Sequence, residues 1–159
     1  MSEPGDSEVR WLALAIRSES DQPHEWSYIG WTIRNRVLSH RYPDTYQGVI
    51  LQPKQFSYFN AFIAPGQSAA TIYERAKAGY AGDATGWAEN DLARAEDCAH
   101  ELIRAPRWQA PFGVDVMHYY SPVSMKPAGS KPPWAPTAKR LFAPSGVDPS
   151  RFLFAAGVL

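Results

Sequence analysis

Proline is distributed unevenly along this chain: nine of its fourteen prolines lie between Pro106 and Pro149. Because proline lacks a backbone N–H and its ring clashes with the preceding helical turn, a segment this rich in proline does not form long helices. The residues before Pro106 instead carry apolar side chains at helical spacing. The sequence therefore predicts a mostly helical α+β fold with a small β element in the C-terminal third.

Four helices are expected from apolar side chains at positions i, i+3, i+4 and i+7. Pro23 suits the first turn of the second helix, where no N–H is needed, and Pro106 ends the fourth. The expected helices span residues 7–20, 23–37, 68–80 and 85–105.

Two strands are expected in the proline-rich part, in "DVMHYYSP" (115–122) and "RFLFAAGV" (151–158). The segment between them is too long for a hairpin turn, and long loops of this kind are often functional. The sequence has no internal repeat and no second domain boundary. Residues 1–159 are therefore expected to form a single domain whose last third packs on the helices.

Charge and composition exclude several classes of protein. Sixteen acidic residues balance sixteen basic ones, so no overall field favours nucleic acid or a membrane surface. No apolar run is long enough to span a membrane, and the polar start "MSEPGDSEV" does not resemble a secretory signal peptide. The single cysteine, Cys98, excludes an internal disulfide and a cysteine-only zinc site. No cofactor is expected.

Glu19 is the residue of greatest chemical interest. It follows Ile16 by three residues and Leu12 by seven, which places it on the helix stripe that should face the core. A carboxylate there must be paired, neutral or next to a cleft, unless the helix end turns it to water. The six tryptophans and eight tyrosines favour an aromatic cleft, in which partial burial would keep a general acid protonated. Flat apolar faces with a polar edge also suit sugar rings.

Several short motifs follow one another in a fixed order from about residue 9 to 154. They are Glu19, "SDQP", "RNRV" (34–37), "YPDT" (42–45), "GVI", "QPKQFSY" (52–58), "HYYSP" (118–122) and Trp134. In order and spacing they resemble the spore cortex-lytic, cell wall hydrolase family, whose catalytic domain is lysozyme-like. Two departures stand out: the link from Glu19 to Asn35 is about two residues shorter and lacks a second acid, and Ser121 replaces the usual asparagine.

The resemblance implies cleavage of peptidoglycan glycan strands at the β-1,4 bond between N-acetylmuramic acid and N-acetylglucosamine. Glu19 would protonate the glycosidic oxygen and then accept a proton from the muramoyl 6-hydroxyl, as in a lytic transglycosylase. A water-using muramidase would need a second carboxylate. Asp44, Asp91 and Asp115 are the candidates, and none lies in a recognisable catalytic context.

The expected substrate-binding residues come from the same motifs. Tyr119 and Tyr120 should alternate across a strand, so only one is expected to face the cleft, and Tyr120 is preferred because it lies nearer the Pro122 turn. Asn35 is expected to be structural. Ser20 follows Glu19 as in the Glu-Ser pair of soluble lytic transglycosylases. The full set is Ser20, Gln55, Ser57, Tyr58, Tyr119, Tyr120 and Trp134.

Three other functions compete with this interpretation. A zinc hydrolase is disfavoured because His24, His40, His100 and His118 show no ligand spacing. A cysteine peptidase is disfavoured because Cys98 lies on a charged helix without a nucleophile-type turn. A non-catalytic peptidoglycan-binding component of a phage-like particle stays open. A phage endolysin or virion-associated lysin, made in the cytoplasm and brought to the cell wall by a holin or by the virion, would fit the absence of a signal peptide.

Overall fold

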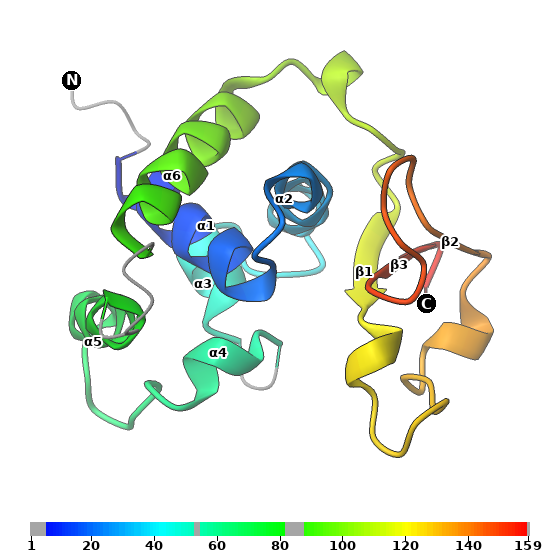
Figure 1. Cartoon of the computed structure of the whole chain (residues 1–159). Helices are drawn as coiled ribbons and strands as arrows, with labels where there is room; N and C mark the ends of the chain where they lie inside the picture. Colours follow the sequence, from blue (N-terminus) through cyan, green and yellow to red (C-terminus); the bar gives the residue numbers. More distant parts are fainter. Residues whose placement is uncertain (1–5, 53–54, 82–87, 159) are drawn as a thin grey trace.

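The computed structural model describes residues 6–52, 55–81 and 88–158. In these ranges the helices come first along the chain and a small antiparallel sheet follows (Figure 1). The helices are α1 (Asp6–Glu19), α2 (Pro23–Leu38), α3 (Tyr46–Ile50), α4 (Ser57–Asn60), α5 (Ala69–Ala81) and α6 (Ala88–Arg104). The strands are β1 (Val116–Tyr120), β2 (Arg140–Phe142) and β3 (Leu153–Ala156).

This architecture confirms the predicted mostly helical α+β class, and α1, α2, α5 and α6 correspond to the four expected helices. The expected start of the fourth helix, at residues 85–87, lies outside the described residues. The short helices α3 and α4 and the three-residue strand β2 were not predicted, because elements this short show no clear periodicity. Among the described helices, none has the length and apolar character needed to cross a membrane.

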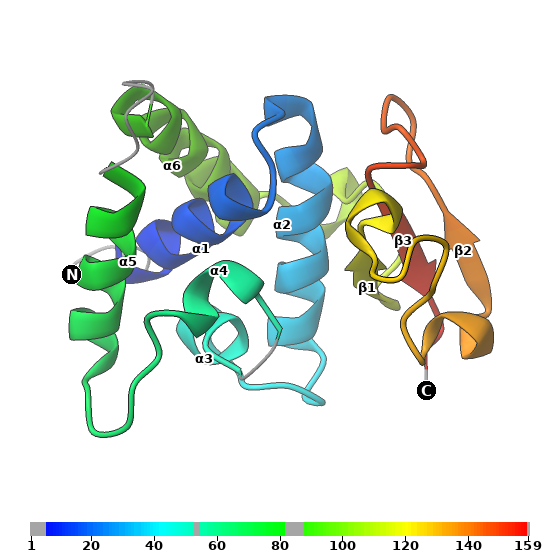
Figure 2. The same ribbon diagram turned by 60° about the horizontal axis from the view of Figure 1, so that its bottom comes forward.

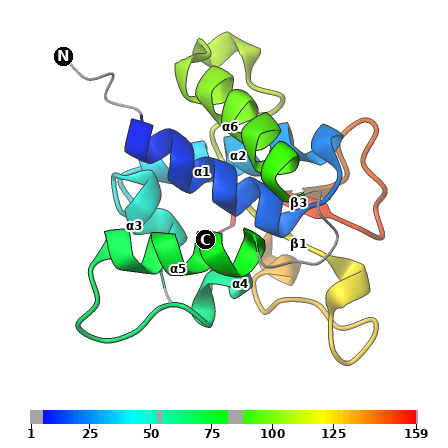
Figure 3. The same cartoon turned by 60° about the vertical axis from the view of Figure 1, so that its left-hand side comes forward.

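Helix α1 lies at the centre of the helical part. Its six consecutive side chains from Trp11 to Ile16 are at most 3% exposed, as expected for a helix that other elements surround. It packs against α2, α3 and α6 (Figure 3). The Trp11 ring also contacts Tyr73 of α5. Because Glu19 is the last residue of this buried helix, its carboxyl emerges at the edge of the core.

The sheet lies on the other side of α2 from the remaining helices (Figure 2). Its strand order is β1-β3-β2, and both neighbours run antiparallel to the central β3. Two α2 side chains tie β1 to the helix: Asn35 Nδ2 donates to the Val116 carbonyl at 2.9 Å, and Arg36 Nε donates to the Met117 carbonyl at 2.6 Å. Asn35 therefore has the structural role expected from the sequence.

The opposite side of α2 approaches α6 closely at Gly30. A Cβ atom on Gly30 would lie 2.5 Å from Leu102 Cδ1, so a larger residue there would require the Leu102 side chain to shift. Arg34 strengthens the same contact, because its Nη1 donates to the carbonyls of Leu102 at 2.7 Å and Ala105 at 2.8 Å. One side of α2 is thus fixed to α6, and the other holds β1.

Candidate active site

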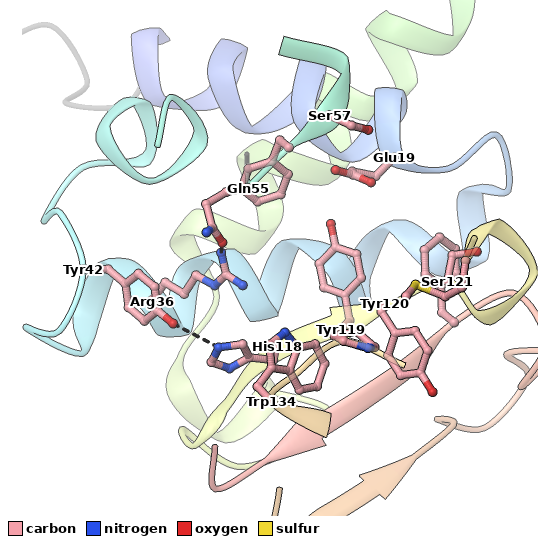
Figure 4. Close-up of a pocket in the computed structure, with 14 residues that line it drawn as sticks. Glu19, Arg36, Tyr42, Gln55, Ser57, His118, Tyr119, Tyr120, Ser121 and Trp134 are labelled. Carbon is pink, nitrogen blue, oxygen red and sulfur yellow. Dashed lines mark hydrogen bonds between the residues drawn. The ribbon is translucent and has the colours of Figure 1, made fainter. Parts of the chain in front are cut away.

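A cavity of about 480 Å³ opens between the helices and the sheet (Figure 4). The helical side contributes Glu19 from the end of α1, Arg36 from α2 and residues 55–57 at the start of α4. The sheet side contributes residues 118–120 of β1, and the loop after β1 adds Trp134. Segments far apart in the sequence therefore converge on one hollow.

A second cavity, of about 420 Å³, continues from the first. The two share Glu19, Ser57, Ser121 and Phe152. The first is largely aromatic, whereas hydroxyl groups and Arg151 dominate the second. Since Glu19 lines both, a ligand that extends through the two cavities would pass its carboxyl.

The Glu19 carboxyl has the electrostatic environment of an acid that is easily protonated. Burial raises its pKa to about 7, although a hydrogen bond from the Tyr119 hydroxyl and the positive charge of Arg36 act in the opposite direction. Its side chain remains partly exposed at the cavity surface. Near neutral pH, Glu19 can therefore both donate and accept a proton, as a general acid or base must.

Tyr119 and Tyr120 both line the first cavity, so the prediction that only one would face it is wrong. Both residues pair regularly with β3, and Tyr120 is the last residue of β1, so the cavity reaches both rings by extending around this end of the strand. The Tyr119 hydroxyl points towards Glu19 (Figure 4), and burial together with the Glu19 charge holds its pKa well above 10. Tyr120 instead packs edge-on against Trp134, with ring centroids 5.8 Å apart.

Arg36 is a functional candidate that the motif analysis missed. Its side chain is 5% exposed, yet it lines the first cavity. Its Nη1 donates to Gln55 Oε1 at 3.0 Å, and its guanidinium lies 5.0 Å from the centre of the Tyr42 ring. A signal was present in the sequence: Arg36 follows Ile33 by three residues and Ile29 by seven, the same core-stripe position that singled out Glu19.

His118 lies at the Arg36 end of the cavity. Burial lowers its pKa to about 4, and the positive charges of Arg36 and Arg41 add to this effect. Its ring lies 4.9 Å from Trp134, and its Nε2 is 3.3 Å from the Tyr42 hydroxyl. His118 is therefore neutral near pH 7. Across the described ranges, no group of three or more His, Cys, Asp or Glu side chains is placed to hold a metal ion.

Two of the predicted substrate-binding residues point away from the cavities. Ser20 is 4% exposed, and its hydroxyl donates to Glu25 Oε1 at 2.5 Å. The Tyr58 hydroxyl donates to the Ala76 carbonyl of α5 at 2.6 Å. Tyr58 and Ser57 are consecutive on α4, where neighbouring side chains diverge by about 100°, so only Ser57 reaches the cavity. The structure does bring Gln55, Ser57, Tyr119, Tyr120 and Trp134 together around Glu19.

The three aspartates considered as a second catalytic group lie elsewhere. Asp44 and Asp115 are exposed and line neither cavity. Asp91 pairs with the buried Arg17 of α1 at 3.3 Å, which is a structural contact between α1 and α6. Of the described residues that line the two cavities, Glu19 is the one carboxylate.

Comparison with known proteins finds a match to one protein family. A model of the Cell Wall Hydrolase family matches residues 21–140, which is 120 of the 159 residues. No curated protein and no solved structure matches the chain. The matched segment includes Arg36, Gln55, Tyr119 and Trp134 and begins two residues after Glu19. The match therefore does not identify Glu19 as a site residue, and the cavity geometry is the structural reason to consider it. Because the match covers well over half of its length, the chain belongs to the cell wall hydrolase family, which acts on peptidoglycan.

Proposed function

We propose that this protein cleaves the glycan strands of peptidoglycan between N-acetylmuramic acid and N-acetylglucosamine, as a lytic transglycosylase with Glu19 as its acid and base. The observation that carries the proposal is the position of Glu19. It lines both cavities, its pKa is about 7, and no other carboxylate of the described residues lines either cavity. This arrangement supports a reaction that uses one carboxyl group.

In the first step, neutral Glu19 donates its proton to the glycosidic oxygen while the bond from that oxygen to the muramoyl anomeric carbon breaks. In the second step, the muramoyl 6-hydroxyl oxygen bonds to the anomeric carbon and its proton passes to the Glu19 carboxylate. The products are a free 4-hydroxyl and a 1,6-anhydro sugar, and Glu19 is protonated again. Water takes no part, and a largely aromatic cavity helps to exclude it.

Two neighbours of Glu19 support this double role. Between the steps Glu19 is an anion, and the Tyr119 hydroxyl and the Arg36 charge both favour that form. Burial favours the neutral form that begins the cycle. These opposing effects keep the pKa near neutrality, where proton donation and proton acceptance are both efficient.

The remaining cavity residues suit a sugar chain. Tyr120 and Trp134 offer aromatic surfaces for the faces of the rings. The Gln55 amide accepts from Arg36 through its oxygen, which leaves its N–H groups for a substrate acetamido carbonyl. Ser57 and Ser121, which line both cavities, can bind sugar hydroxyls on either side of the reacting bond.

The decisive experiment is digestion of purified sacculi, followed by mass spectrometry of the released muropeptides before and after borohydride treatment. A lytic transglycosylase releases 1,6-anhydromuramoyl ends, which are lighter by one water than hydrolytic ends and unchanged by borohydride. Reducible fragments that carry the additional water would instead show a muramidase. Binding to sacculi without release of fragments would show a non-catalytic component. The route by which the protein reaches the cell wall stays a prediction.

A further inference from the structure

Glu25, in the first turn of α2, is a buried carboxylate that the proposed mechanism does not use. It is 1% exposed. Arg151 binds it through two hydrogen bonds, from Nε to Oε2 and from Nη2 to Oε1, each 2.9 Å long. Ser20 adds a third, to Oε1. Glu25 lines neither cavity, so it is not placed to activate a water molecule there.

The charge of Glu25 follows from these contacts. Burial on its own would raise the pKa of this carboxyl, but the hydrogen bonds from Arg151 and Ser20 and the Arg151 charge lower it overall. Glu25 is therefore ionised at neutral pH. A two-fold arginine–carboxylate contact also fixes the relative orientation of its partners, because both N–H bonds must be aligned.

The partners of Glu25 lie at the two sides of the cleft. Ser20 directly follows Glu19, and its carbonyl accepts from Trp26 Nε1 at 2.8 Å. Arg151 precedes β3 and lines the second cavity together with Glu19 and Phe152. The network therefore joins the C-terminal end of α1 to the segment that leads into the sheet.

The contacts also return to Glu19 by a second path. Phe152, which follows Arg151, packs against the Tyr119 ring with centroids 5.8 Å apart. The Tyr119 hydroxyl in turn bonds the Glu19 carboxyl. A closed ring of contacts thus runs from Glu19 through Ser20, Glu25, Arg151, Phe152 and Tyr119 back to Glu19.

We propose that Ser20, Glu25 and Arg151 form a positioning network that holds the Glu19 carboxyl at a fixed place between the two walls of the cleft. The inference rests on the proposed function, because the position of Glu19 matters only if Glu19 reacts. A displacement of about 1 Å at a reacting group can lower the rate a hundredfold, so Ser20 and Glu25, which line neither cavity, can have a large effect without touching the substrate.

Glu25→Gln tests the network, because glutamine keeps the shape of the side chain and removes its charge. Ser20→Ala is the milder second variant if Glu25→Gln does not fold. Arg34→Gln is the matched control: it also removes a charged side chain that ties α2 to another segment, at Leu102 and Ala105, but it lines neither cavity. All variants are assayed on soluble, uncross-linked glycan fragments, well below their melting temperatures.

The expected result is a fall in kcat of about tenfold or more for Glu25→Gln, with KM changed much less, while Arg34→Gln keeps the wild-type kcat at a lowered melting temperature. The pH at which Glu19 titrates, followed by carbon NMR of labelled glutamate side chains, should move in Glu25→Gln and in Ser20→Ala but not in Arg34→Gln. Wild-type kcat and wild-type Glu19 titration in both network variants would overturn the inference. The NMR titration can be measured on a protein that has no activity. An inactive wild-type protein would refute the proposed function, and the Glu19 titration would still show whether the network positions the Glu19 carboxyl.

Discussion

Arg36 of α2 and Glu19 of α1 line the same cavity, and the charge of Arg36 lowers the pKa that burial raises on Glu19. Glu19 has the reciprocal effect and favours the charged form of Arg36. Hydrogen bonds to the Met117 carbonyl and to Gln55 keep the guanidinium in place. An almost fully buried cation is thus held in the same cavity as Glu19 by neutral acceptors, which leaves its charge to act on that carboxyl.

Removing this charge should change the pH dependence of the reaction. Arg36→Met takes away the group that favours ionised Glu19, so the pKa of Glu19 should rise above about 7. The alkaline limb of the kcat/KM profile should then move to higher pH, because neutral Glu19 is the form that starts the proposed reaction. Arg36→Lys keeps the charge and is the control. An alkaline limb at the same pH in Arg36→Met and wild type would show that Arg36 only supports the fold.

Glu19→Gln should abolish most of the glycan-cleaving activity. Glutamine has nearly the same size and still accepts a hydrogen bond from Tyr119, but it cannot donate the proton that the leaving oxygen needs. We expect the rate on sacculi to fall by at least about a hundredfold, a typical contribution of a general acid. Circular dichroism and binding to sacculi serve as controls for the fold and the cleft. Clearance of sacculi at a near wild-type rate would assign the acid to another residue.

The sequence located Glu19 because a position on a helix stripe follows directly from helical periodicity. The same rule extends to Arg36, which occupies the equivalent position relative to Ile29 and Ile33. It does not give the direction of a side chain in a four-residue helix or at a helix end. For this reason Ser57 and Tyr58 could not be separated, and the inward direction of Ser20, which follows the last residue of α1, was not predicted.

The Glu25–Arg151 contact was out of reach of sequence reasoning for a different reason. The two residues are 126 positions apart, and no local pattern marks an arginine before a strand as the partner of a glutamate in a helix. Both cavities likewise depend on the path of the proline-rich loop after β1, which periodicity does not determine. The Glu25–Arg151 contact and the two cavities are therefore set by packing between segments that are far apart in the sequence.

Tyr58 and Tyr120 should respond to substitution in opposite ways. Tyr58 packs on Phe59 and Phe62 and bonds the Ala76 carbonyl, away from the cavities. Tyr58→Ala should therefore lower the free energy of unfolding by on the order of 3 kcal/mol and leave kcat of the folded protein near the wild-type value. Tyr120→Ala, which removes a ring from the cavity wall, should reduce kcat/KM at least about tenfold with a smaller shift in melting temperature. A larger rate loss for Tyr58→Ala than for Tyr120→Ala would place Tyr58 in the cleft after all.

The raised pKa of Glu19 also makes a prediction about stability. In the unfolded chain a glutamate titrates near the model value of 4.5, whereas in the folded protein Glu19 titrates near 7. Between these values the folded state binds the additional proton, so the Glu19 contribution to the free energy of unfolding falls as pH rises through this window. Above about pH 7 the carboxyl is ionised in both states, and the folded protein bears the full penalty of burying the charge.

Glu19→Gln removes this penalty, since glutamine has no charge to bury. The variant should match the wild type in stability near pH 4 and exceed it at pH 8 by up to about 3 kcal/mol, because one pKa unit corresponds to about 1.4 kcal/mol. Urea unfolding of both proteins across this range measures the difference, and the effect of His118 cancels because that residue is present in both. A difference that stays constant from pH 4 to pH 8 would mean that the folded-state pKa of Glu19 is not raised. In the proposed mechanism, the stability gained at pH 8 and the activity lost have one cause, the burial of a carboxyl that must both donate and accept a proton. A constant difference would remove that common cause.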